Sequence, residues 1–182
     1  MTVSFTILPG LPPYGPMALP FPQGGTQAFR EGLVVQFDTG DGAPWTGNFQ
    51  RGWDVLDKVL LPPGGGQVIV IAGGQFYLVD PVARKTLGQT MGINYAEVHP
   101  SHNAVLLGTL THFEAWRADG LWWKSPRISW DGIRNVRVKD NQLTGEAYTP
   151  LGDTWHPFTL DLLTGKCADS IYEADMSRRP KE

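Results

Sequence analysis

Four tryptophans lie within one short stretch of this chain, and they are the side chains best suited to binding a partner. They are Trp116, Trp122, Trp123 and Trp130, with Arg127 shortly before the last of them. Tryptophan and arginine are enriched among the residues that contribute most to the affinity of protein interfaces. Two interpretations stand: the five residues form a surface for a protein or a sugar, or they pack between layers of the fold. Trp122 and Trp123 are adjacent, so on a regular strand they point to opposite faces.

Histidines form the second group that could do chemistry. Three of the four histidines are close in the sequence: His99, His102 and His112. Imidazole is the commonest metal ligand, and a His-x-x-His spacing across a turn can bring two rings together. However, the only close carboxylates are Glu97 and Glu114, and no cysteine lies nearby to complete a ligand shell. We therefore expect structural roles for these histidines and no cofactor, with a metal-dependent enzyme as a distant alternative.

Motifs for covalent catalysis are missing from the sequence. It contains no Gly-x-Ser-x-Gly element, and the single Cys167 has no flanking histidine. The glycines at 64–66 precede a predicted strand instead of a helix, which argues against a phosphate-binding loop. The sequence thus favours a binding protein over an enzyme, while the question of catalytic activity stays open.

A short pattern, Asp-x-x-x-x-Lys, recurs at the ends of predicted hairpins. Its copies span Asp80–Lys85, Asp119–Lys124 and Asp161–Lys166, at a spacing of roughly 37 to 45 residues. One such unit cannot bury its apolar faces alone, so consecutive units are expected to stack. The aspartates could bind a ligand at one end of such a stack. The simpler interpretation is that each accepts backbone hydrogen bonds from its own turn.

Turn residues divide residues 32–172 into short apolar runs, which predict units of about four strands each. The predicted strands are 33–37, 54–61, 67–72, 75–79, 85–87, 95–99, 104–109, 113–117, 121–124, 133–138, 142–148, 154–160 and 167–172. The stretch 59–80, VLLPPGGGQVIVIAGGQFYLVD, resembles a β-propeller blade of the WD-repeat or quinoprotein type, and 95–124 resembles the next blade. Residues 121–133 are similar to uncharacterised bacterial proteins. The resemblance implies an all-β fold: an antiparallel meander of short strands that forms a small or incomplete β-propeller.

The 182 residues are expected to form a single domain. Residues 1–8 alternate like a strand, and 9–25 form a Pro/Gly-rich arm that is not expected inside a sheet, because proline lacks a backbone donor. The first strand is expected to pair with residues 167–172 and so close the structure. The repeated β-meander occupies 32–172, and 173–182 are expected to fray.

The segment 48–61 has two interpretations. Phe49, Trp53, Leu56 and Leu60 have helical spacing, whereas the repeat favours a strand from Asp54. Both alternatives stay open at this point.

Composition limits the classes of partner. There are 15 basic and 18 acidic residues, giving a net charge of −3 without a basic stripe, so nucleic acid is not expected. The apolar run 68–72 is too short for a membrane span. The single cysteine excludes an internal disulfide, and six prolines interrupt residues 1–29, unlike a secretory signal. These features predict a cytoplasmic protein.

The functional expectation is a non-enzymatic module that binds another protein, of a toxin-neutralising or scaffold type. The alternative is binding of a carbohydrate or small ligand through the tryptophan cluster. The sequence does not decide the oligomeric state or the identity of the partner.

Overall fold

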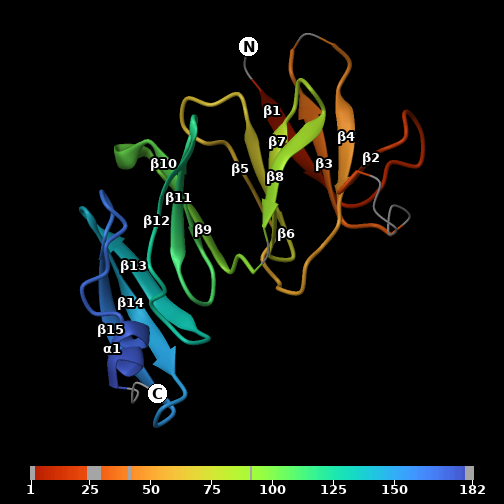
Figure 1. Ribbon diagram of the computed structural model, residues 1–182. Helices are drawn as coiled ribbons and strands as arrows, with labels where there is room; N and C mark the ends of the chain where they lie inside the picture. The colour runs from red at the N-terminus through yellow and green to blue at the C-terminus, as the bar shows by residue number, and fades with distance from the viewer. Residues whose placement is uncertain (1–2, 24–29, 41, 91, 179–182) are drawn as a thin grey trace. The chain divides into compact units, whose positions relative to one another are not determined.

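The computed structural model describes residues 3–23, 30–40, 42–90 and 92–178 (Figure 1). Of the described residues, 49% lie in strands and 7% in helices, and the strands form four sheets in which most neighbours are antiparallel. This confirms the prediction of an all-β fold of the small or incomplete propeller-like class. The chain divides into two compact units, residues 1–94 and 95–182, each of which contains two of the sheets.

The first unit contains the first and second sheets. The first sheet has the order β1-β3-β4-β2, with β1 at Ser4–Leu8, β2 at Leu19–Phe21, β3 at Leu33–Asp38 and β4 at Trp45–Phe49. The second sheet is a meander in chain order, with β5 at Lys58–Leu60, β6 at Val68–Ala72, β7 at Gln75–Asp80 and β8 at Lys85–Thr90. The predicted strands of the second sheet are confirmed to within a few residues, except the first, which is shorter.

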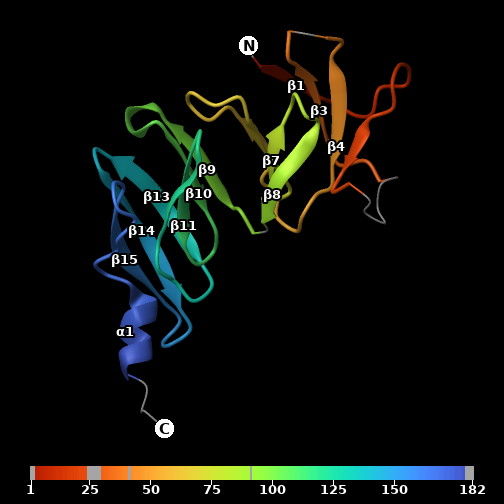
Figure 2. The same ribbon diagram turned by 45° about the horizontal axis from the view of Figure 1, so that its top comes forward.

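The second unit contains the third and fourth sheets. The third sheet is another meander, with β9 at Tyr95–His99, β10 at Ala104–Gly108, β11 at Phe113–Arg117 and β12 at Gly120–Lys124. A short 3-10 helix, Pro100–His102, connects β9 and β10. The fourth sheet has three strands, β13 at Ile133–Lys139, β14 at Gln142–Thr149 and β15 at Thr154–Asp161, and the helix α1 (Ile171–Arg178) lies near one end of it (Figure 2).

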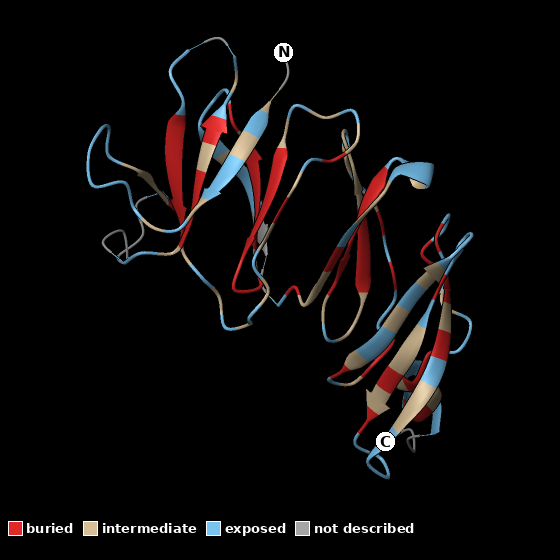
Figure 3. Ribbon diagram, turned by 180° about the vertical axis from the view of Figure 1, so that it is seen from behind, coloured by how far each residue is buried: buried red, intermediate tan, exposed pale blue. Residues whose placement is uncertain are grey.

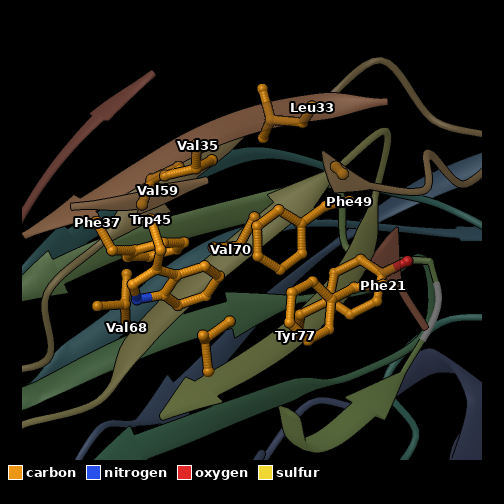
Figure 4. Packing of buried hydrophobic residues seen from close by; sticks show 12 residues of the cluster. Phe21, Leu33, Val35, Phe37, Trp45, Phe49, Val59, Val68, Val70 and Tyr77 are labelled. Atoms are coloured by element: carbon orange, nitrogen blue, oxygen red, sulfur yellow. The ribbon is translucent and has the colours of Figure 1, made fainter. Parts of the chain in front are cut away.

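The core of the first unit lies between its two sheets (Figure 4). Period-2 alternation places Val68, Val70 and Ala72 on one face of β6, and all three are fully buried in this core. Phe49 of β4 faces them from the first sheet, and its ring centroid lies 5.3 Å from that of Tyr77, the cross-strand neighbour of Val70 on β7. Burial of this apolar surface is what holds the two sheets of the unit together.

The core of the second unit is built the same way. Its buried residues come from the third and fourth sheets (Figure 3), from the connections that hold Ile128 and Leu162, and from Ile171 at the start of α1. Phe113 of β11 and Phe158 of β15 contribute two fully buried rings, with centroids 6.0 Å apart. The helix therefore belongs to the packed structure of this unit.

Two of the Asp-x-x-x-x-Lys segments are turns of the same kind. Asp80 Oδ1 accepts hydrogen bonds from the backbone N–H groups of Val82 and Ala83, at 3.0 and 2.9 Å. Asp161 Oδ1 accepts the corresponding bonds from Leu163 and Thr164, both at 2.9 Å. The interpretation of these aspartates as turn residues is confirmed. The lysines differ: Lys85 begins β8, Lys124 ends β12, and Lys166 precedes a single bridge residue instead of a strand.

The N-terminal region corrects two predictions. β1 pairs along its whole length with β3, so its predicted pairing with residues 167–172 is wrong. Phe5 of β1 packs on the apolar core of the first unit, which explains the choice of partner. The proline-rich arm also contributes a strand, since β2 pairs with β4 in parallel. Its position at the edge of the sheet tolerates Pro20, because an edge strand leaves one side of its backbone unpaired.

Residues 48–61 are neither a helix nor a continuous strand. β4 ends at Phe49, a loop follows, and β5 covers only Lys58–Leu60. The reason lies at Gly52, where a Cβ atom would be 2.5 Å from the carbonyl oxygen of Gly73. The backbone of the loop lies directly against the β6–β7 turn and cannot coil into a helix there.

The C-terminal region also differs from expectation. Residues 167–172 do not form a strand: Cys167 makes a single bridge to Leu160, and α1 starts at Ile171. The prediction of a frayed tail is wrong for residues 173–178, which are helical, while 179–182 lie outside the described residues. Within the described part of the chain, no helix is both long enough and apolar enough to cross a membrane.

Candidate interaction site

The five residues proposed from the sequence as a binding surface do not form one site. Trp123 is buried in the core of the second unit, and its indole Nε1–H donates to the carbonyl oxygen of Leu162 at 2.8 Å. The N–H group of a buried tryptophan normally has a hydrogen-bond partner. Here the partner is a carbonyl group in the turn that follows β15. Trp123 therefore joins the third sheet to the fourth.

Trp122 corrects the prediction that adjacent tryptophans point to opposite faces. Ala115 pairs with Trp123 and Trp116 pairs with Leu121, so Trp122 is an extra residue in β12, a β-bulge. Because of the bulge, Trp122 and Trp123 both pack against the core of the second unit, with ring centroids 6.1 Å apart. The guanidinium carbon of Arg117 lies 3.3 Å from the centroid of the Trp122 ring, which covers one face of that ring.

Trp116 belongs to a network centred on Glu114, a buried carboxylate of β11. Glu114 accepts hydrogen bonds from Trp116 Nε1 at 3.1 Å and from Lys124 Nζ at 2.9 Å, and His112 Nε2 lies 3.4 Å away. The contact with His112, followed by those with Lys124 and Trp116, outweighs burial and lowers the pKa of Glu114 to about 2. The carboxylate is therefore ionised and satisfied within the fold, which is unlike a general acid or base.

Trp130 and Arg127 are brought together beside α1. Trp130 Nε1 donates to the buried carboxylate of Asp175 at 3.0 Å, and the hydroxyl of Thr149 donates to the same oxygen at 2.7 Å. The guanidinium carbon of Arg127 lies 4.6 Å from the ring centroid of Tyr172 and 5.9 Å from that of Trp130. These contacts fasten the helix to β14, through Thr149, and to the connection between β12 and β13, through Trp130 and Arg127.

The three histidines have different partners. His99 lies 3.8 Å from Glu97 and is largely buried, and that burial lowers its pKa. His102 Nε2 bonds to Asn141 Oδ1 at 2.9 Å. His112 Nδ1 bonds to the hydroxyl of Thr111 at 2.9 Å. Among the described residues, no group of three or more His, Cys, Asp or Glu side chains is placed to hold a metal ion.

Among the described residues, the most exposed apolar side chains belong to a loop that was not proposed from the sequence as a binding surface. Trp53 and Val55 are each 96% exposed, more than any of the four clustered tryptophans. They alternate with Asp54 in the segment 50–57 between β4 and β5, called here the Trp53 loop. A cavity of about 140 Å³ opens beside it, lined by Trp53, Tyr77 and Pro22 among others. Tryptophan is enriched among the residues that contribute most to protein–protein binding, so an exposed indole on an ordered loop is a candidate contact for a partner.

The Trp53 loop is held firmly against the β6–β7 turn. Backbone hydrogen bonds join Gly52 N to Ala72 O at 2.9 Å, Asp54 N to Gly73 O at 3.0 Å, and Gly74 N to Leu56 O at 2.9 Å. The loop therefore resembles an added strand at that turn more than a free connection.

Aspartate side chains complete this anchoring. Asp57 accepts a hydrogen bond from Gly73 N at 2.8 Å and forms an ion pair with Arg51. Asp54 Oδ1 accepts from the backbone of Val55 at 2.6 Å, which turns the chain so that Val55 faces solvent.

Neither protein-family models nor curated protein sequences match this chain.

Proposed function

We propose that this chain is a non-enzymatic module that binds another protein, and that the Trp53 loop is its main contact surface. The observation that carries the proposal is the complete exposure of Trp53 and Val55 on a loop pinned by hydrogen bonds. Covering a tryptophan with a partner removes 150–250 Å² of mostly apolar surface from water, which favours binding by roughly 4 to 6 kcal/mol before the costs of association.

The anchoring of the loop supports the same conclusion. A flexible loop loses conformational entropy when it binds, whereas one already held by its backbone loses little. Gly52, Asp54 and Gly74 all use their N–H groups in the contact between the loop and the β6–β7 turn. Trp53 and Val55 are thus presented in a fixed orientation, as the anchor residues of an interface are.

Charges on the loop favour a protein over a phosphate-bearing partner. Arg51 is paired with Asp57, and Asp54 adds a further negative charge. A surface that binds nucleic acid or anionic lipid needs unpaired basic residues. A protein with an apolar depression the size of an indole fits this loop better. Toxin-neutralising and scaffold roles, in a cytoplasmic setting, both agree with such a contact.

Carbohydrate binding through the tryptophan cluster is the second candidate, and it has less support. A sugar needs an open aromatic face on which to stack. Trp123 is buried, and Arg117 covers one face of Trp122. Trp116 and Trp130 use their indole N–H groups within the fold.

The test is quantitative capture of partner proteins by the full chain from extracts of cells that express it. Trp53→Ser with Val55→Ser should lower recovery of a specific partner at least tenfold, since both anchor side chains are removed. The matched control is Val82→Ser with Leu151→Ser, two half-exposed apolar residues on other turns, 54% and 55% exposed. Equal recovery with both double variants would contradict the role of the Trp53 loop. Release of the captured partner by a simple sugar would favour the second candidate.

A further inference from the structure

One residue of the first unit adopts a backbone conformation that its side chain makes unfavourable. Arg84 precedes Lys85 in the β7–β8 turn and has a positive φ of 53°. The matching position of the β15 turn in the second unit is Gly165, with φ of 69°. Glycine adopts such angles freely, whereas other L-residues are strained. Backbone strain of this kind is concentrated at functional sites, so the surroundings of the Arg84 side chain are relevant to ligand binding.

The Arg84 side chain is exposed and lines a cavity of about 160 Å³ in the first unit. Among the residues that the structure describes, its guanidinium has no ion pair or hydrogen bond. Tyr14 and Met17 of the proline-rich arm and Trp45 of β4 line the same cavity. An unpaired guanidinium beside apolar and aromatic walls is a site for an anion that carries an apolar group.

Two more polar groups face this cavity. Gln36 of β3 and Thr46 of β4 are cross-strand partners, and both line it. Within the described ranges neither side chain makes a hydrogen bond to another residue. The amide of Gln36 and the hydroxyl of Thr46 can each donate to an oxygen atom. The cavity thus combines a cation, two neutral donors and a mostly apolar wall.

We propose that this cavity binds a carboxylate attached to a short apolar group, with Arg84 pairing to the carboxylate through two parallel hydrogen bonds. Gln36 and Thr46 donate to the same carboxylate, and Tyr14 and Met17, which are 90% and 91% exposed in the free protein, contact the apolar part and lose some of that exposure on binding. The volume is below the roughly 300 Å³ at which pockets for larger ligands begin, so the ligand is a small acid or the C-terminal residue of a peptide. This site is separate from the Trp53 loop and does not depend on its role.

The test is an NMR titration of the full chain labelled with ¹⁵N. Trp45 lines the cavity, and its indole N–H, bonded to Pro81 O at 2.8 Å, reports on it. Trp123 makes the corresponding bond in the second unit and serves as an internal control. With N-acetyl-leucine, the Trp45 indole signal should shift saturably, with a Kd in the millimolar range or below, while the Trp123 signal stays in place.

Two further ligands and two variants test the roles of the carboxylate and of Arg84. N-acetyl-leucine amide, which lacks the carboxylate, should bind at least tenfold more weakly. Arg84→Gly, which relieves the backbone strain and removes only the side chain, should weaken binding by the same factor, and Arg84→Lys should lie between. No saturable shift at Trp45, or equal binding by Arg84→Gly, would overturn the proposal. Isobutyrate binding as tightly as N-acetyl-leucine identifies a free small acid as the ligand class, and weaker binding identifies a peptide terminus.

Discussion

Trp123 packs its indole ring directly over Gly165, and a Cβ atom on that glycine would lie only 2.6 Å from the ring. The same indole donates its N–H to Leu162 O at 2.8 Å. Trp123 of the third sheet thus contacts the turn that follows β15 in two ways, by packing of its ring and by a hydrogen bond. In the first unit, Trp45 donates to Pro81 O at 2.8 Å, in the turn that follows β7. Both units therefore join two sheets by an indole that binds the carbonyl group following a turn aspartate.

Replacement of Gly165 by alanine should destabilise the second unit by roughly 2 to 5 kcal/mol. The new methyl group collides with Trp123, and the positive φ adds strain. The matched control is Gly152→Ala, where φ is 85° and the nearest atom lies 4.0 Å away. It should cost only the backbone strain, about 1 to 2 kcal/mol. Urea unfolding followed by tryptophan fluorescence measures both, and equal losses would argue against the contact with Trp123.

Arg84→Gly should have the opposite effect on stability. The substitution relieves the strain of a positive φ, and this gain exceeds the entropy that glycine loses on folding. We expect an increase of about 0.5 to 1 kcal/mol in the free energy of unfolding. Thermal unfolding of the variant and of Arg84→Ala, which keeps the strain, provides the comparison. A lower melting temperature for Arg84→Gly than for Arg84→Ala would show that the turn is not strained.

The meander strands were predictable because turn residues bracket each of them. Glycines and aspartates bound the runs at 75–79 and 142–148, and the structure has strands there within one residue of the prediction. Local signals of this kind do not say which strand pairs with which. The partner of β1 was therefore missed, because its pairing with β3 joins segments separated by the whole proline-rich arm.

The residues proposed for binding were harder to place for a different reason. The bulge at Trp122 adds one residue to β12 and leaves no trace in the alternation of apolar residues. Likewise, composition does not show whether an indole is buried. Trp53 has helical spacing with Leu56, yet the bonds from Gly52 and Asp54 to the β6–β7 turn direct it to solvent. The orientations of Trp122 and Trp53 are therefore set by contacts between segments that are distant in the sequence.

Removal of the Asp175 carboxylate should loosen α1. Asp175→Ala leaves the Trp130 indole N–H and the Thr149 hydroxyl without this acceptor in a buried setting, at a cost of roughly 2 to 4 kcal/mol. Glu173→Ala, an exposed position on the same helix, is the control and should change stability by less than about 0.5 kcal/mol. Hydrogen exchange of the α1 amides should accelerate only in Asp175→Ala. Unchanged protection in that variant would show that the apolar contacts of Ile171 suffice to hold the helix.

Glu114 should make the second unit sensitive to acid. Its pKa is lowered from 4.5 in the unfolded chain to about 2 in the fold, first by the contact with His112. A carboxyl group whose pKa is lowered by folding stabilises the protein fully above its unfolded pKa, and that contribution is lost as the pH falls from about 4.5 toward 2. The difference corresponds to about 3 kcal/mol at neutral pH.

Glu114→Gln should therefore be less stable than the parent protein at pH 7, and the free energies of unfolding of the two proteins should converge as the pH approaches 2.5. Urea unfolding of both proteins across this range measures the effect. A stability difference that stays constant with pH would assign the role of Glu114 to packing instead of charge.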